Sequence, residues 1–142
     1  MSDATMPVDV VSAAGHVLTG DARELYARGV EGEIGILPGH APALVALDVG
    51  ALRIVMADGS KERVAVHKGV LFVGEDGKVI VLADIAERAG DIDVERARAK
   101  AERAQRRLER ARESDVEAHR TSLRKHELRI RVGTGTGDPH AG

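Results

Sequence analysis

The side chains best suited to chemistry in this sequence are the arginines and lysines of one segment near the C-terminus. Residues 91–131 carry 13 basic and 9 acidic side chains, whereas residues 1–90 carry 8 basic and 13 acidic ones. Arg96 and Arg103 lie seven positions apart, which places both guanidinium groups on one helix face, where they are able to hold phosphates. The same segment also suits an acidic protein surface, or it is only a solvated helix face. A nucleic-acid reader normally has a stronger basic bias, so we expect none here.

Other candidate sites in the sequence are weaker. Only His119 and His126, of six histidines, share a predicted helix, and zinc ligands on a helix usually lie closer together than these two. No Ser-His-Asp or Cys-His arrangement indicates a nucleophile, and the chain contains no cysteine. The glycine-rich run 133–137 lacks the Lys and the Ser or Thr that a phosphate-binding loop requires. We therefore expect no catalytic residue and no metal site.

A helical hairpin must position the basic residues. Residues 91–132 contain no Gly or Pro, and Asp91 is placed to cap a first helix. Ser114 and Glu117 match the capping box of a second helix that begins at Asp115. The apolar residues recur at helical spacing, as Ala97, Ala101, Ala104, Leu108 and Ala111 in the first helix and as Val116, Leu123 and Ile130 in the second. Because alanine buries little apolar area, we expect a marginally stable hairpin that detaches easily.

The preceding part of the chain predicts a β-domain. Short β-branched runs alternate with turn signals such as Asp58-Gly59, Lys68-Gly69 and Asp76-Gly77. Many short strands at close spacing indicate a sandwich or a barrel. Only Tyr26 and Phe72 are aromatic, so the core must consist of Val, Leu, Ile and Ala. No apolar run approaches the roughly 20 residues of a membrane helix, so we expect membrane contact only through a partner.

Four segments follow one another in an order that is typical of one protein family. They are Gly32-Glu33-Ile34-Gly35-Ile36-Leu37-Pro38-Gly39-His40-Ala41-Pro42, then Gly69-Val70-Leu71-Phe72-Val73, then Val79-Ile80-Val81-Leu82-Ala83-Asp84, and finally Ala86-Glu87-Arg88-Ala89. Together with the basic hairpin they resemble the epsilon subunit of the bacterial F-type rotary ATP synthase, over about residues 7–132. The first segment is also explained as a tight structural turn, and both explanations can hold together.

The resemblance implies a mainly β fold with an α-helical part: an N-terminal flattened β-sandwich followed by a C-terminal antiparallel two-helix hairpin. We expect a disordered N-terminus at 1–6, the sandwich at 7–88, a regulatory helical domain at 89–132 and a disordered tail at 133–142. It also implies a non-catalytic accessory subunit. Its place would be peripheral, at the cytoplasmic face of the bacterial cell membrane.

The partners that the resemblance implies are the gamma subunit, the c-ring and the alpha/beta catalytic hexamer. The sandwich would bind gamma and meet the c-ring through Glu31, Glu33 and His40, so that proton-driven rotation is coupled to ATP synthesis. The helices would extend into the hexamer and block ATP hydrolysis. The side chains that would then face acidic loops of the catalytic subunits are Arg103, Arg106, Arg107, Arg110 and Arg112.

Some family members bind ATP on the folded hairpin through an Ile-Asp-x-x-Arg-Ala motif, and residues 92–97 match it at every fixed position. The resemblance implies no required cofactor but ATP as a regulatory ligand, held by Glu87, Asp93, Arg96, Arg103 and Arg129. Lys125 stands where those members have an arginine, and lysine offers a point charge without the planar fork. Glu87 and Asp93 are also explained as residues that only cap and position the helix.

Three other functions compete with a motor subunit. A free-standing nucleotide sensor would use the same hairpin but has no evident need for the Gly32–Pro42 segment. A generic adaptor with a helical arm explains the composition but not the four ordered segments. An independent enzyme fits least, because no nucleophile or metal constellation is present in the sequence.

Overall fold

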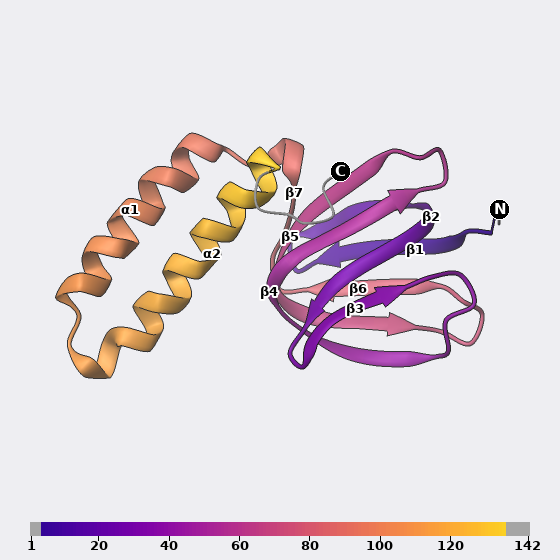
Figure 1. The fold of residues 1–142 in the computed structure, drawn as a ribbon, viewed down its shortest axis with the longest axis horizontal. Helices are drawn as coiled ribbons and strands as arrows, with labels where there is room; N and C mark the ends of the chain where they lie inside the picture. The colour runs from indigo at the N-terminus through magenta and orange to yellow at the C-terminus, as the bar shows by residue number, and fades with distance from the viewer. Residues whose placement is uncertain (1–3, 136–142) are drawn as a thin grey trace. The chain divides into compact units, whose positions relative to one another are not determined.

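The computed structural model describes residues 4–135 and divides between Arg88 and Ala89 into two compact units. The first unit contains all the strands and the second contains both long helices (Figure 1). The predicted fold class, a β-sandwich followed by a two-helix hairpin, is therefore confirmed.

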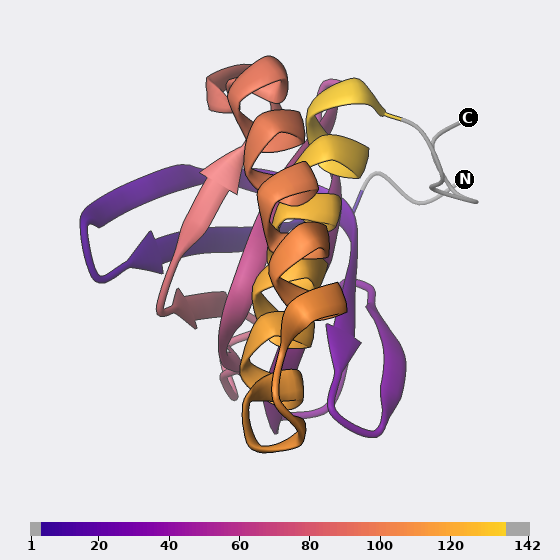
Figure 2. The same cartoon turned by 90° about the vertical axis from the view of Figure 1, so that its left-hand side faces the viewer.

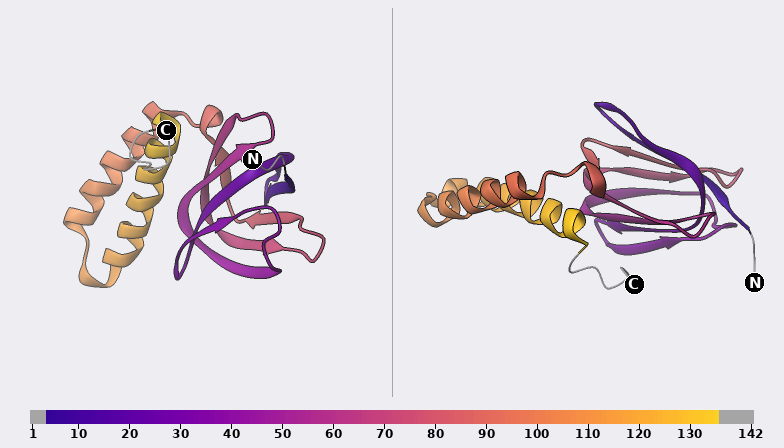
Figure 3. Two further views of the ribbon diagram at one scale, coloured as in Figure 1. Left: turned by 45° about the vertical axis from the view of Figure 1, so that its right-hand side comes forward. Right: turned by 90° about the horizontal axis from the view of Figure 1, so that it is seen from above.

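A single closed sheet forms the first unit. Its strands are β1 (Met6–Ser12), β2 (Gly15–Gly29), β3 (Gly32–Ile36), β4 (Ala43–Met56), β5 (Lys61–Val73), β6 (Val79–Ala83) and β7 (Ala86–Arg88). The strand order is β1-β6-β5-β4-β2-β3, with β7 on β5, and β1 pairs with β2 as well as with β6. This second pairing of β1 closes the sheet on itself, and Figure 3 shows the strands curling around the enclosed interior. Such a flattened closed sheet satisfies both the sandwich and the barrel prediction.

The core of this unit is aliphatic, as the scarcity of aromatic residues predicts. Alternate residues of β1 point inward, so that Val8 and Val10 are buried while Pro7 is exposed. The largest fully buried side chains of the sheet are Leu25, Ile36, Leu52, Ile54 and Leu71. Each such side chain stabilises the fold by about 1.5–3 kcal/mol relative to leaving it in water.

Strand β5 corrects one sequence expectation. The Lys68-Gly69 pair was expected to be a turn between two strands, but the chain continues through it as one strand that stays paired with β4. Lys68 has a φ of 73° and Gly69 a φ of 157°, so the strand kinks here without ending. A Cβ on Gly69 would lie 2.2 Å from the carbonyl oxygen of Leu82, which explains why glycine stands at the kink.

The Asp58-Gly59 and Asp76-Gly77 turns are confirmed. In the turn that connects β4 to β5, the Asp58 carboxylate accepts a hydrogen bond from the Ser60 amide at 2.9 Å. In the turn that connects β5 to β6, the Asp76 carboxylate accepts a hydrogen bond from the Lys78 amide at 3.0 Å. Both are the local side-chain to backbone bonds through which aspartate favours turns.

The second unit is an antiparallel hairpin of α1 (Val94–Arg110) and α2 (Val116–Thr134). The helices lie side by side in Figure 1, and in Figure 2, turned by 90°, α1 lies in front of α2. Ala97 and Ala104 are buried and Ala101 and Leu108 are half-buried, so the predicted alanine-rich seam of α1 is confirmed. At the open end of the hairpin, Gly133 leaves no room for a side chain, because a Cβ there would meet Val94 at 2.6 Å.

Two predicted helix caps are wrong. Asp91 lies in a short 3-10 turn, and Asp93 caps α1 instead, its carboxylate accepting a hydrogen bond from the Arg96 amide at 3.0 Å. Ser114 lies inside a second 3-10 turn, so it cannot serve as the cap of the predicted capping box. Asp115 is the N-cap of α2 without a side-chain hydrogen bond, and Glu117 pairs with Arg120 at 2.9 Å.

The predicted chain ends also need correction. Strand β1 begins at Met6, inside the segment expected to be disordered, and residues 1–3 lie outside the described part of the chain. Helix α2 continues through Gly133 and Thr134, where the tail was expected to begin. Gly135 then ends it in the left-handed conformation, its amide donating to the carbonyl of Arg131 at 2.9 Å. The rest of the predicted tail, residues 136–142, lies outside the described residues.

Candidate functional site

One side of α1 carries a row of positive charges, which we call the basic stripe. Its members are separated by steps of four and three residues and therefore share one helix face: Arg96, Lys100, Arg103, Arg107 and Arg110. None of the five makes an ion pair within residues 4–135, whereas Arg98, off the stripe, pairs with Glu95 at 3.4 Å. Like charges at these spacings repel, so the stripe suits an anionic partner.

The stripe borders an open depression of about 190 Å³ that Arg103, Arg106, Arg107 and Arg110 line. All four side chains are exposed, and so is Arg112 in the turn that follows α1. The structure thus places the five arginines predicted to contact catalytic subunits on one helix and its following turn.

Helix α2 brings a histidine to the basic stripe. The ring of His126 is half-buried, and its Nδ1 is buried without a hydrogen bond to any of residues 4–135. Burial, followed by the charges of Arg129, Lys100, Arg103 and Arg107, holds the pKa of His126 below its ordinary value of 6.5. Arg129 of α2 therefore acts on the same histidine as three members of the basic stripe, Lys100, Arg103 and Arg107.

Four of the five predicted nucleotide residues belong to the helical unit. Arg96 and Arg103 lie on α1 and Arg129 on α2, all in the helical unit. The carboxylate of Asp93 is already engaged as the α1 cap. Glu87 belongs to the first unit, on β7, where its Oε1 lies 3.8 Å from Nε2 of the buried His67. Lys125, which replaces an arginine of the resemblance, is half-buried on α2.

A second group of predicted site residues surrounds β3. Glu31 lies exposed in the turn between β2 and β3, and Glu33 lies on β3. Arg53 of β4 makes an ion pair with Glu33 and also lies over the Tyr26 ring, with 5.5 Å between its Cζ and the ring centroid. Burial, followed by a hydrogen bond to Glu24, raises the pKa of Tyr26 above its ordinary value of 10.0. The Glu33 carboxylate is thus positioned by a cation rather than freely solvated.

His40 follows the opposite end of β3. Its Nδ1 lies 2.6 Å from the Ala41 carbonyl oxygen, and because a carbonyl only accepts, Nδ1 is the donor. The five residues of β3 span about 16 Å at strand spacing, so Glu31 and His40 do not form one cluster. The predicted foot is therefore an extended edge rather than a compact pocket.

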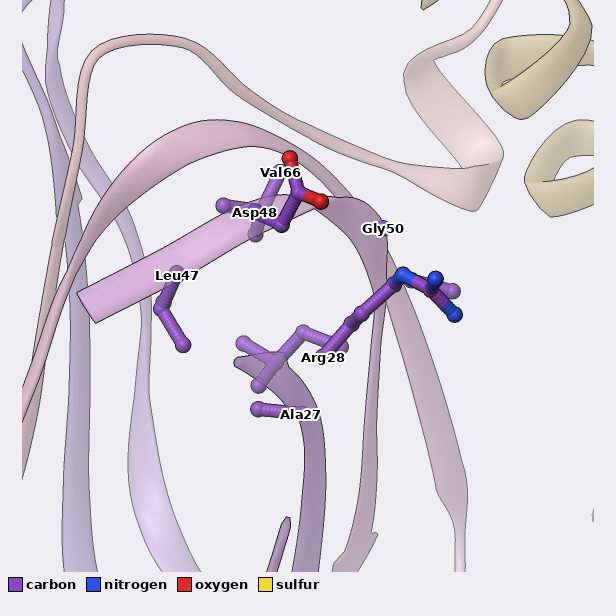
Figure 4. Close-up of a pocket in the computed structure, with 8 residues that line it drawn as sticks. Ala27, Arg28, Leu47, Asp48, Gly50 and Val66 are labelled. Atoms are coloured by element: carbon purple, nitrogen blue, oxygen red, sulfur yellow. The ribbon is translucent and has the colours of Figure 1, made fainter. Parts of the chain in front are cut away.

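A small, partly open pocket lies next to the bend of β4. Ala27, Arg28, Leu47, Asp48, Gly50 and Val66 line it together with Ala51 and Leu52, and Figure 4 shows the Arg28 stem passing close to Gly50. Its volume is about 10 Å³, which corresponds to about one water molecule and excludes a cofactor.

The outer side of β4, β5 and β6 presents a continuous apolar surface, which we call the apolar face. Its main members are exposed by 36% to 73%: Leu44, Val70, Phe72 and Leu82. Leu44 is directly opposite Phe72 across β4 and β5, and Val70 is directly opposite Leu82 across β5 and β6, so the four side chains share one side of the sheet. An apolar patch of this continuity on a sheet marks an interaction site.

Within residues 4–135, no helix combines the length and apolar character that crossing a bilayer requires. In the same residues, no group of three or more His, Asp or Glu side chains is arranged to hold a metal ion.

Comparisons with known proteins agree with this architecture. Residues 5–89 match the family model described as "ATP synthase, Delta/Epsilon chain, beta-sandwich domain". The chain belongs to the ATP synthase epsilon-chain family. An ATP synthase epsilon chain of Desulforamulus reducens is 41% identical over 128 residues, covering 90% of this chain and 95% of the relative. One of Bordetella petrii is 46% identical over 99 residues, covering 70% of each chain.

A solved structure shares the fold of this epsilon-family member. It belongs to the mitochondrial ATP synthase of Euglena gracilis, described as an OSCP/F1/c-ring assembly, and it superposes with a TM-score of 0.78. The alignment covers 88% of this chain and 79% of the other chain, at 22% sequence identity. At this identity the likeness supports the fold.

Sequence reasoning missed two features of this epsilon-family chain. Lys100 and His126 were not predicted as site residues, although Lys100 stands four residues after Arg96 and three before Arg103. The apolar face was also missed. Its signal was the unbroken apolar run from Val70 to Val73, because a strand with only one buried side should alternate apolar and polar residues.

Proposed function

We propose that this chain is the non-catalytic epsilon subunit in the central stalk of a proton-translocating rotary ATP synthase. In this role it couples rotation of the c-ring and gamma to ATP synthesis, and its helical unit regulates ATP hydrolysis. Its place is peripheral, on the cytoplasmic face of a bacterial cell membrane, which it contacts only through the complex. Family membership and the surfaces described above support this proposal.

The observation that carries the proposal is the apolar face. Leu44, Phe72 and Leu82 expose 73%, 45% and 55% of their surface although each stands in a regular, well-paired strand. A chain that works alone gains nothing from such a surface, whereas a subunit buries it against its neighbour. We assign this face to gamma, the partner of the sandwich in the family.

The edge around β3 is the second contact that we propose. Glu31 at the β2–β3 turn, Glu33 and His40 offer two carboxylates and one imidazole to the polar loops of the c-ring. Because Arg53 holds Glu33 in place, this contact requires little reordering of the side chain on binding.

The helical unit supplies the regulatory part. The seam of α1 is mostly alanine, so separating the helices exposes little apolar area, which suits an element with two arrangements. When extended, it would bring Arg103, Arg106, Arg107, Arg110 and Arg112 to acidic loops of the catalytic subunits and inhibit hydrolysis. The unpaired charges of the basic stripe favour such a partner.

ATP is the regulatory ligand that we propose for the folded hairpin. These donors suit a phosphate chain, because Arg96, Arg103 and Arg129 all belong to the helical unit. Arg96 and Arg103 make no ion pair within residues 4–135, so their guanidinium groups are available to a ligand. Asp93 would act by ordering the helix start from which Arg96 projects. The chain needs no cofactor in this proposal.

The direct test measures ATP hydrolysis by a purified alpha–beta–gamma core, with and without the full chain. We expect binding with inhibition, and we expect a version that ends at Arg88 to bind without inhibiting. A Leu44→Glu/Phe72→Glu variant should lose binding to the core, whereas Ala13→Glu, at an exposed turn of the same unit, should retain it.

The outcomes separate the competing functions. Binding without inhibition would support the role as a stalk subunit and would contradict the regulatory role of the helices. Failure of the full chain to bind a cognate core overturns the proposal and leaves a nucleotide sensor or an adaptor. Equal binding by the apolar-face variant and the parent chain would place the gamma contact elsewhere on the sandwich.

A further inference from the structure

His126 occupies an unusual place in the hairpin. It projects from α2 into the charge field of α1, with a half-buried ring and a buried Nδ1 that has no hydrogen-bonding partner among residues 4–135. A buried ring nitrogen without a partner destabilises the closed hairpin to some degree, because its hydration is lost and nothing replaces it. The position is therefore not explained by packing alone.

The charged groups that act most strongly on His126 are all cations. Lys100, Arg103 and Arg107 face it from α1, and Arg129 acts on it from α2 itself. The acidic residues of α1 recur every seven positions on a different stripe of the helix, as Glu95, Glu102 and Glu109. Glu127 is exposed on α2, next to His126 in the sequence but about 100° away around the helix. A proton on the ring would thus add a fifth positive charge among four others.

We propose that His126 is an acid-sensitive latch of the helical hairpin: a neutral ring permits α1 and α2 to close, and a protonated ring drives them apart. This inference concerns the helical unit alone. It does not depend on the proposed inhibition of ATP hydrolysis and is tested independently of it.

The direction of the pH dependence follows from the two states. In the closed hairpin, burial and the four cations hold the pKa of His126 below 6.5, whereas separated helices return the ring to water and its ordinary pKa. The closed state is therefore fully favoured above pH 6.5 and loses its advantage as the pH falls toward the lower pKa. Across that interval the ratio of open to closed hairpins rises by up to about tenfold per pH unit.

A pair of spectroscopic labels measures this opening in the full chain. The sequence has no cysteine, so Ala99→Cys and Glu127→Cys give two unique, exposed attachment points, one on each helix. Packed helices lie about 8–10 Å apart between their axes. One continuous helix would separate the two positions by about 42 Å at about 1.5 Å per residue, so the two states are readily distinguished.

The expected result is a shift toward the long distance between pH 7.5 and pH 5.5. His126→Gln should stay closed at both pH values, and His126→Arg should be open at both. His119→Gln is the matched control, because it removes a second histidine one heptad earlier on α2, and it should respond like the parent. A pH response that persists in His126→Gln, or that is absent from the parent, would overturn the latch.

Nuclear magnetic resonance supplies a measurement that needs no substitution at the latch. The ring signals of His126 in the parent chain should titrate below pH 6.5, and below those of the same residue in a peptide of the α2 sequence. A His126 pKa at or above the peptide value would refute the proposal, even if the His126 variants failed to fold.

Discussion

Replacing Gly69 by alanine should damage the sandwich far more than an ordinary glycine substitution. Gly69 sits at the kink of β5, and a Cβ would lie 2.2 Å from the Leu82 carbonyl oxygen and 2.7 Å from the Ala83 Cα. Both are backbone atoms of β6, so no side chain can rotate away. Relief requires that β5 and β6 separate where Gly69 pairs with Ala83.

The expected loss of folding free energy in Gly69→Ala has two parts. Forcing an alanine into a positive-φ conformation costs about 1–2 kcal/mol. Overpacking a well-packed interior adds about 1–3 kcal/mol, and the upper end applies here because the obstruction is backbone. The sum is about 4–5 kcal/mol, a large part of the roughly 5–15 kcal/mol that stabilises a typical domain. A unit of this size should lose about 16 °C or more in Tm.

Gly59→Ala is the matched control, because Gly59 also has a positive φ, 88°, but no atom within 4 Å of the added Cβ. The assay is urea unfolding of the full chain followed by tyrosine fluorescence. Tyr26 is the only tyrosine and there is no tryptophan, so this signal reports on the sandwich alone. If Gly69→Ala loses no more stability than Gly59→Ala, the close approach of β6 is not what requires glycine.

Three further predictions use the same chain. Lys68→Asn should stabilise the sandwich by about 0.5 kcal/mol in the same urea assay, because asparagine tolerates the positive φ that lysine adopts at 73°. Asp93→Ala should destabilise α1 by about 0.5–2 kcal/mol, seen as earlier thermal loss of helical circular dichroism, while Asp93→Ser should retain most of the cap; equal losses would contradict the capping role. The single tyrosine should ionise above pH 10.0 by absorbance, and Glu24→Gln should lower that pKa. Since the pKa is raised in the folded state, this contribution to stability is present below pH 10.0 and is lost as the pH rises through the folded value.

Local patterns in the sequence were sufficient for the order and class of the elements. The stepwise alanines of α1 and the aspartate turns at 58 and 76 depend on nearby residues only, and both appear as expected. The Lys68-Gly69 prediction was wrong because the requirement for glycine arises from the pairing of β5 with β6, where Gly69 lies opposite Ala83. That contact joins residues that are distant in the sequence, so no local signal distinguishes it from a turn.

Helix ends and site residues were harder to predict from the sequence. Asp91, Asp93 and Ser114 are all good caps by residue type, and the choice among them depends on where the 3-10 turns fall. Individual basic residues of α1 could be named from the motif and from helical spacing. The role of His126 could not, because its environment combines one helix with charges from the other.

The closure of the sheet by β1 has a consequence for the order of folding. β1 pairs with β6, so Val8 meets Val79, 71 positions later in the chain. The ring cannot close on a growing chain until nearly the whole first unit has been synthesised, whereas the hairpin needs only its own neighbouring residues. Until that moment β1 is paired with β2 on one side only and its other edge is open, and unpaired strand edges favour aggregation. Loss of the first dozen residues would remove β1 and leave the facing edges of β2 and β6 permanently open, so a shortened N-terminus should yield an insoluble protein rather than merely a less stable one.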